Sequence, residues 1–376
     1  MPWVGASVAG CAFFYFLIFA QFGFLHRLSS LEVRENLIEM AMFAMGFGGI
    51  VGSLFTARRF RIDSSKNWLI SGFVGCGLAA LGSVVATGIW IQLGIALLVG
   101  LSLGSLTVSV VPTLRALFPA NRIGLWTSVA VGAAYFLSNS PAVFRSSAEG
   151  HCLLGAFACC IGLVVSLRVP SLKEACLTES DAPISSSPRL FETKGVLVIA
   201  TLFLALIWLD SAAFYIIQNS DSLKAISWST DADLWRNASL HFILALLGGW
   251  ILDRGWLFSG LFLSFVLLEA GAWCLGHGTA AAGMATLLYV SGVSIYSTAL
   301  VAYGALAPER VGSWRISARA GLVFALGGWF GSGMGIGMAR DLKGIPGMFL
   351  AIAGLVGIGS LYARWKMEPR VEMDSR

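Results

Sequence analysis

Residues 206–218 read LIWLDSAAFYIIQ, which places one carboxylate, Asp210, deep inside an apolar run that begins at Gly195. A charged side chain at the centre of a bilayer costs roughly 2.5–3.5 kcal/mol on insertion scales, and such residues mark sites, proton relays or internal partners. On a helix Asp210, Phe214 and Gln218 share one face because they are four residues apart. We therefore expect Asp210 to be functional. The alternative is a hydrogen-bonded Asp that only packs two helices together.

The composition is that of a protein with many membrane-spanning helices. Of the 376 residues, 57% are hydrophobic and only 12% are charged, whereas soluble domains are about 25% charged. The mean hydropathy is +0.80. The formal charge of +5 is distributed over loops, so it does not indicate a nucleic-acid partner. We predict an all-α polytopic membrane protein whose surroundings are the lipid bilayer.

The sequence lacks the signals of catalysis and of bound cofactors. The seven cysteines fall mostly inside apolar runs and form no C-x-x-C pair, which is typical of small apolar packing residues. No Walker motif is present, and no glycine-rich loop follows a predicted strand. We predict no enzyme activity, no cofactor and no resident metal.

Apolar runs of about 20 residues, the length that crosses a bilayer, occur twelve times. They cover roughly residues 3–25, 37–57, 67–88, 90–112, 123–144, 150–168, 195–217, 234–252, 257–275, 280–304, 317–339 and 345–363. The longest polar interval follows the sixth run and is typical of a flexible linker. The expected organisation is an N-terminal six-helix half (1–168), a cytoplasmic linker (169–194) and a C-terminal six-helix half (195–376).

The Lys and Arg residues predict the orientation. With twelve spans, most of them fall on the side that carries both termini and the linker. Cytoplasmic loops are enriched in Lys and Arg, so both termini are expected in the cytoplasm. The short loops favour a multi-pass protein of the bacterial inner (plasma) membrane.

The two halves show signs of an internal repeat. Placing Gln21 on Asp210 aligns residues 17–21 with residues 206–210, and the same shift aligns residues 116–119 with residues 305–308. Parallel repeats of six spans are one way to build a transporter, with the site between the repeats near the midplane. On that geometry Gln21 and Asp210 are equivalents that face each other across a central cavity.

Residues 249–255, GWILDRG, form a second motif with a weaker first-half copy. The copy at residues 52–58, GSLFTAR, has Thr56 where the other has Asp253. With the twelve spans and the central loop, these motifs make the chain resemble the major facilitator superfamily (MFS). The resemblance implies twelve transmembrane helices in two six-helix halves related by pseudo-two-fold symmetry. It also implies a gating latch formed by Gly52, Arg58, Gly249, Asp253 and Arg254.

The resemblance further implies that spans 1, 4, 7 and 10 line the cavity. The candidate residues for solute or proton binding are Tyr15, Gln21, Ser105, Ser109, Asp210, Tyr215, Ser294 and Tyr296. A single serine in such a helix is as readily explained by packing, since its hydroxyl can bond its own backbone or a neighbouring helix. A carboxylate that changes protonation with the access state would couple transport to protons, and Asp210 is the candidate.

The most favoured function is secondary active transport of a small solute by alternating access, as a symport with protons through Asp210. The solute is expected to be neutral or cationic, because the candidates include one acid and no base, and the protein is expected to be a monomer. One alternative is a non-transporting assembly or sensor partner on the same fold, with a filled apolar cavity. Another is a soft-metal importer that uses Met40, Met42, Met45, Met334 and Met338.

Glu39 and His241 could form an outer gate with Arg236.

Overall fold

The computed structural model describes residues 1–173, 188–275, 281–307 and 312–367, and all regular secondary structure in these ranges is helical. Six long segments form the first part of the bundle: α1–η1–α2 (Pro2–Tyr15, Phe16–Gly23, Phe24–Ser30), α3 (Glu35–Arg59), η2–α4 (Ile62–Ser64, Ser65–Val85), α5 (Ile89–Leu117), η3–α6 (Ala120–Arg122, Ile123–Ser138) and α8 (Ala148–Ser166). The short helix α7 (Pro141–Phe144) lies between the last two.

Six further long segments follow: α9 (Thr193–Asn219), α11 (Asp231–Asp253), α12 (Leu257–Leu275), α13–η7 (Ala282–Ala302, Tyr303–Leu306), α14–η8–α15 (Ser313–Val323, Phe324–Gly331, Ser332–Asp341) and α16 (Gly347–Met367). Two short helices accompany them, η5 (Pro188–Phe191) and α10 (Asp221–Ser227). Each of the twelve predicted spans coincides with one long segment to within a few residues. The segment 174–187 of the predicted linker and the residues 308–311 after η7 lie outside the described residues.

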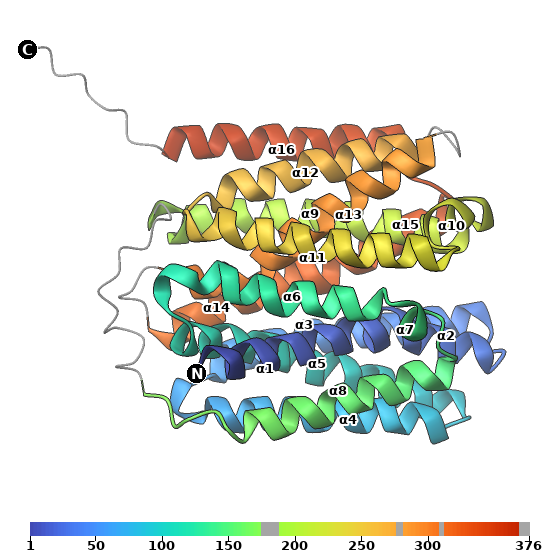
Figure 1. Ribbon diagram of the computed structural model, residues 1–376, viewed down its shortest axis with the longest axis horizontal. Coiled ribbons are helices and arrows are strands. Elements are labelled where there is room, and N and C mark those ends of the chain that lie inside the picture. Colours follow the sequence, from blue (N-terminus) through green and yellow to red (C-terminus); the bar gives the residue numbers. More distant parts are fainter. Residues whose placement is uncertain (174–187, 276–280, 308–311, 368–376) are drawn as a thin grey trace, which may run out of the picture.

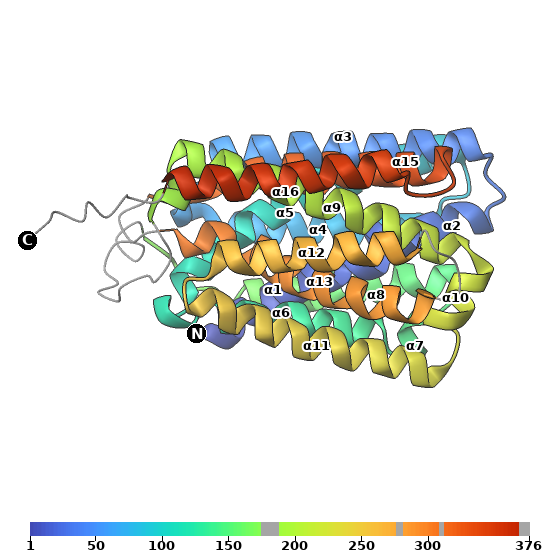
Figure 2. The same cartoon turned by 90° about the horizontal axis from the view of Figure 1, so that it is seen from above.

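The long segments run side by side along the long axis of the molecule (Figure 1). The N-terminus and the C-terminal end of α16 lie at the same end of the bundle, here called the termini end. The short helices α2, α7 and α10 lie at the opposite end, here called the distal end (Figures 1 and 2). Hydrophobic side chains are exposed along the sides of the bundle, for example Phe43, Leu78, Ile243 and Leu355. Such large exposed apolar surfaces are typical of contact with a membrane.

Ten helical segments in the described part of the chain are long and apolar enough to cross a membrane. The two predicted spans that do not qualify correspond to α6 and α11. Helix α6 has only 16 residues, and the first turns of α11 carry Asp231, Asp233 and Arg236. These two helices pack directly against each other. Both belong to the bundle of twelve long segments, although one is too short and the other too polar to count as a span by length and composition.

Glycines allow the closest helix contacts. A side chain at Gly100 or Gly104 of α5 would collide with the backbone of α3. In the same way Gly327, Gly331 and Gly335 pack against α9, as is typical of small residues four positions apart at a close helix contact. Neither contact crosses between the halves. The first holds α3 against α5 in the first half, and the second holds the α14–η8–α15 segment against α9 in the second half.

Two long segments contain a π-helical stretch that the sequence reasoning did not predict. The first, η1, interrupts the first span, and the second, η8, interrupts the eleventh. Short π-helical stretches inside α-helices are rare and occur frequently at functional sites. Here they carry Gln21 and Trp329, which both line the same cavity.

Candidate functional site

A cavity of about 620 Å³ lies between the two sets of six segments. One wall comes from η1, α3, α5 and α6, and the other from α9, α11, α13, η8 and α15. The lining extends to Glu39 and Arg340, which belong to the distal end of α3 and α15, and toward the termini end it reaches Leu300 and Val301 in the last turn of α13. The volume is within the usual range for small-molecule sites, about 300–1,000 Å³.

Asp210 lines this cavity, and two tyrosines of one helix hold its carboxylate. Tyr289 on α13 donates a hydrogen bond of 2.7 Å to Oδ1, and Tyr296 donates one to Oδ2. Seven residues separate the two tyrosines, so they project from the same face of α13. Asp210 is 6% exposed, and among the described residues no Lys, Arg or His forms an ion pair with it. It is therefore a buried acid held by neutral donors alone.

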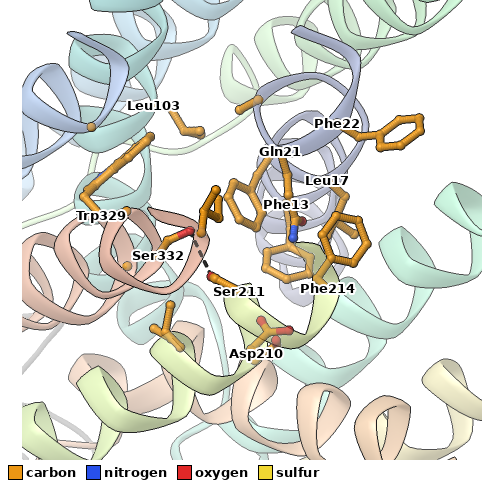
Figure 3. A pocket seen from close by; sticks show the side chains of 18 of the residues that line it. Phe13, Leu17, Gln21, Phe22, Leu103, Asp210, Ser211, Phe214, Trp329 and Ser332 are labelled. Atoms are coloured by element: carbon orange, nitrogen blue, oxygen red, sulfur yellow. Dashed lines mark hydrogen bonds between the residues drawn. The ribbon is translucent and has the colours of Figure 1, made fainter. Parts of the chain in front are cut away.

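Gln21 projects toward the same space from η1 (Figure 3). The predicted equivalence of Gln21 and Asp210 thus corresponds to two polar side chains on facing helices of one cavity. Next to Asp210, Ser211 on α9 donates a hydrogen bond of 2.9 Å to Ser332 on α15 (Figure 3). This pair joins two helices of the second half at the cavity wall.

A second cluster of polar side chains at the cavity wall is formed by residues of three helices. The rings of Tyr135 on α6 and His241 on α11 are stacked, with centroids 4.2 Å apart and planes 3° apart. The Tyr135 hydroxyl lies 3.0 Å from Ser297 Oγ, and His241 Nδ1 lies 2.8 Å from Ser294 Oγ. The contacts of Tyr135 cross from the first half of the bundle to the second. Sequence reasoning missed Tyr135, and it grouped His241 with Glu39 and Arg236, whereas the contacts of His241 are to Tyr135 and Ser294.

Most of the cavity wall is apolar and aromatic. The rings that contribute are Phe13, Phe16, Phe22, Phe43, Phe47, Tyr135, Phe144, Phe214, Trp228, Tyr289, Tyr296, Phe324, Trp329 and Phe330. The only charged residues of the described lining are Asp210, Glu39 and Arg340, and the last two form an ion pair. The cavity therefore combines a large apolar surface with a single unpaired acid.

Five of the predicted binding residues do not line the cavity. Tyr15 is fully buried against α8, beside Gly155, and its hydroxyl has no partner in the described structure. The hydroxyls of Ser105, Ser109 and Ser294 bond to backbone carbonyl groups, which is the packing role left open for serines. Tyr215 is absent from the cavity wall as well.

The ion pairs between the two halves in the described structure lie at the distal end. Arg340 on α15 lies 3.0 Å from Glu39 on α3, and Arg145 after α7 lies 2.7 Å from Asp231 on α11. Arg236, which was suggested to join Glu39 and His241 in an outer gate, bonds within its own helix, to Asp233. Trp228 also donates a hydrogen bond of 3.1 Å to Asn139, which links the two halves beside the cavity.

At the termini end Asp253 forms a latch between α11 and α6. Its carboxylate accepts the backbone N–H of Gly124 at 2.6 Å and that of Leu125 at 2.9 Å. These are free N–H groups of the first turn of α6, where a carboxylate satisfies donors and favours the helix dipole. Gly249 lies against Gly124 and Ser128, so α6 and α11 approach closely at this point. The predicted latch residues Gly249 and Asp253 thus contact the other half of the bundle.

The remaining latch residues are arranged differently. Arg254 stacks its guanidinium on Trp250 of its own helix, 3.6 Å from the ring centroid. Gly52 packs against Leu101 of α5, within the first half, and Arg58 is exposed. Thr56, which replaces the expected Asp, is fully buried and its hydroxyl has no partner in the described structure. The two copies of the motif therefore make unequal contacts.

The first-half motif still touches the second half through α14. Ser317 on α14 donates a hydrogen bond of 3.3 Å to the carbonyl of Ala57, and Gly321 packs against Ala57 as well. Beside this contact, the end of the predicted linker packs into the second half: Tyr303 donates a hydrogen bond of 3.2 Å to the Leu190 carbonyl and stacks on Phe191. At the termini end the two halves thus meet through hydrogen bonds to backbone groups.

The described residues offer no group of three or more His, Cys, Asp or Glu side chains arranged for a metal ion. Of the methionines considered for a soft metal, Met42, Met45 and Met334 line the cavity, whereas Met40 and Met338 do not. Thioethers at the wall also serve as plain apolar lining.

Comparison with known proteins gives matches in structure and none in sequence. No protein-family model matches the chain, and no curated protein sequence matches it. The solved structure of the MFS proton:xylose symporter XylE, bound to 6-bromo-6-deoxy-D-glucose, is similar with a TM-score of 0.68 and 14% identity over 98% of this chain and 95% of that chain. The human organic anion transporter MFSD10 gives 0.65 and 12%, over 96% of this chain and 97% of its own.

A single-residue variant of the E. coli fucose:proton symporter FucP gives a TM-score of 0.61 and 17% identity over 97% of this chain and 98% of that chain. At these identities the similarity establishes the fold. The chain has the twelve-helix fold of MFS transporters, as the span count and the repeated motif predicted, and it is an integral membrane protein.

Proposed function

We propose that the chain is a secondary active transporter that moves a small solute across the membrane by alternating access, with proton symport through Asp210. The observation that carries the proposal is the position of Asp210. It is a buried acid without a cationic partner, it lies at the wall of a cavity between the two halves, and neutral hydroxyl groups hold it. Acids within membrane spans are costly, and they mark solute or ion pathways and proton relays.

In this proposal residues 1–168 and 195–376 are the two moving halves. The termini end is cytoplasmic, as the Lys and Arg distribution favours. The Asp253 latch closes that end while the cavity extends toward the distal, outer end. Release to the cytoplasm then requires the contacts of Asp253 with Gly124 and Leu125 to break. The distal contacts of Glu39 with Arg340 and of Arg145 with Asp231 are formed as well, so they must break before the cavity opens to the outer end, and they keep that end closed in the opposite state.

The charges of the lining support a neutral or cationic solute. Arg340 is the one Lys or Arg in the described wall, and Glu39 and Asp341 neutralise it. No unpaired Lys or Arg in that wall is available for a carboxylate or phosphate group of a solute. The aromatic surface favours a solute with an apolar portion.

The alternative of a non-transporting protein predicts a filled cavity. The space of about 620 Å³ beside Asp210 favours the transporter instead. The proposal is tested with purified protein in liposomes, with an imposed pH gradient and pools of candidate solutes outside. Solute-dependent proton movement in the wild type supports it. Absence of any solute flux across broad pools favours the alternative, and solute flux without proton flux contradicts the symport.

A further inference from the structure

His241 is fixed on two sides at the cavity wall. It belongs to α11 and is only 3% exposed. Nδ1 lies 2.8 Å from Ser294 Oγ on α13, and the parallel ring of Tyr135 covers one face of the imidazole. The ring cannot rotate without breaking the hydrogen bond or losing the stack. Its two nitrogens therefore have fixed and different surroundings.

The bonds of Ser294 determine which ring nitrogen carries the hydrogen. A serine hydroxyl has one hydrogen to donate, and that of Ser294 is directed at the Val290 carbonyl, 2.6 Å away. Toward His241 the Ser294 oxygen can then only accept, so Nδ1 must be the donor. In a neutral imidazole the other nitrogen, Nε2, then has a free lone pair.

Nε2 of His241 faces the cavity. It has no hydrogen-bond partner among the described residues, it is not one of the fully enclosed unpaired atoms, and the residue lines the cavity. The contrast is His151, which is also buried. There Nε2 lies 3.0 Å from the Val143 carbonyl, and Nδ1 is enclosed without a partner in the described structure. Of these two buried histidines, only His241 offers a lone pair to a molecule in the cavity.

We propose that His241 contacts the solute and accepts a hydrogen bond at Nε2 from an O–H or N–H group of that solute. The inference rests on the proposed function and names the chemistry of its solute. His241 and Asp210 both line the cavity, and each is bonded to a residue of α13, Ser294 and Tyr296 respectively, so two acceptors border the same space. Such a wall recognises a solute that carries at least two hydroxyl or amine groups on a partly apolar frame. It disfavours a solute whose polar atoms are only carboxylate or phosphate oxygens.

The geometry is tested on purified protein without any transport. The probe is diethyl pyrocarbonate, which acylates an imidazole nitrogen through its free lone pair, followed by mass spectrometry of each histidine peptide. We expect His241 to be modified and His151 to be resistant, although both are buried. In ¹⁵N-histidine NMR, the signals lost in the H241N variant should be those of an Nδ1–H, Nε2-bare ring. Equal resistance of His241 and His151, or an Nε2–H ring at His241, overturns the inference.

The solute contact is tested by uptake of the solute identified in the liposome assay. In H241N the amide nitrogen keeps the donor to Ser294 but leaves no acceptor at the depth of Nε2. One lost hydrogen bond should raise KM about three- to tenfold with little change in kcat. H241Q, which can place its amide oxygen near the position of Nε2, should recover part of the loss. The control is H26N, because His26 is exposed and does not line the cavity.

The outcomes separate the two proposals. An unchanged KM in H241N, or a loss that H241Q repeats in full, contradicts a solute contact at Nε2 while transport itself stands. If no solute is transported by the wild type, the proposed function fails and the solute contact fails with it. The probe and NMR results then describe only an accessible histidine.

Discussion

The hydroxyl of Tyr289 lies 2.7 Å from a carboxylate oxygen of Asp210 and donates a hydrogen bond to it across the α9–α13 contact. Tyr296, two turns further along α13, donates to the second oxygen. Both tyrosines and the acid are buried at the cavity wall. The acid is therefore held in place by groups that carry no charge of their own, which leaves its charge free to change with the state of the cavity.

Removing either tyrosine hydroxyl should impair proton-driven uptake. A hydrogen bond to a charged group contributes about 1.5–3 kcal/mol, so we expect Tyr289→Phe and Tyr296→Phe each to lower kcat/KM by roughly ten- to a hundredfold. The assay is initial uptake into liposomes at a fixed pH gradient. Tyr362→Phe is the control, because Tyr362 is exposed on α16. Uptake by the two cavity variants at the level of this control contradicts the assigned role.

The latch at Asp253 should control the opening of the termini end. Asp253→Ala leaves two N–H groups at the start of α6 without their acceptor, at a cost of about 0.5–2 kcal/mol for a lost helix cap. We expect the population with separated halves to increase several-fold. Spin labels at the exposed positions Arg59 and Arg315 report the distance between α3 and α14. Asp63→Ala serves for comparison, since Asp63 pairs with exposed Arg61.

An unchanged distance distribution in Asp253→Ala would show that the latch has no part in closing this end. The second-half motif would then contribute no more to closure than the first-half motif, in which the Thr56 hydroxyl has no hydrogen-bond partner in the described structure.

The effects of reversing the charges of Glu39 and Arg340 on distal opening should compensate each other. Both side chains are partly exposed, so screening by water limits the strength of the pair. We expect Glu39→Arg and Arg340→Glu each to favour distal opening, and the double exchange to restore the wild-type distribution in part. Reactivity of a cysteine placed at Gly333, inside the cavity, measures that opening. A double variant that is at least as open as the more open single variant contradicts the pairing.

Gly49 and Gly46 on α3 should respond oppositely to the same substitution. A Cβ at Gly49 would overlap the indole of Trp329, whereas one at Gly46 would meet nothing within 4 Å. Gly49→Ala should destabilise the protein, while Gly46→Ala should be neutral or stabilising because Ala favours a helix by up to about 1 kcal/mol over Gly. Thermal unfolding in detergent compares the two. Equal melting temperatures would show that Trp329 does not pack on α3 in solution.

The positions of the helices could be predicted from the sequence because each apolar run indicates a span by itself. An apolar run of membrane length fixes a span whatever its neighbours are, and a motif at a helix end marks a contact such as that of Asp253. The π-helical stretches η1 and η8 could not be read this way, since they depend on one extra residue within a hydrogen-bond ladder.

The cavity was only partly predictable for a related reason. Asp210 and Gln21 stand out because polar side chains are rare in apolar runs. Ser105, Ser109 and Tyr15 looked similar in the sequence, but the direction of each side chain depends on the rotation of its helix in the bundle. The stack of Tyr135 on His241 joins residues from different halves, so no local pattern could indicate it. Tyr296 was among the candidates, whereas Tyr289 was not; the seven-position spacing of the two tyrosines, which puts them on one helix face, could have indicated the pair.

The most direct test of the account is solute-driven proton movement in liposomes for wild-type protein beside Asp210→Asn. Asparagine keeps the size of the side chain and can still accept hydrogen bonds from the tyrosines, but it cannot exchange a proton. We predict that solute and proton enter together in the wild type and that the variant loses uptake driven by the pH gradient while it still folds. An Asp210→Asn protein that accumulates solute against its gradient with wild-type proton flux would contradict the central claim.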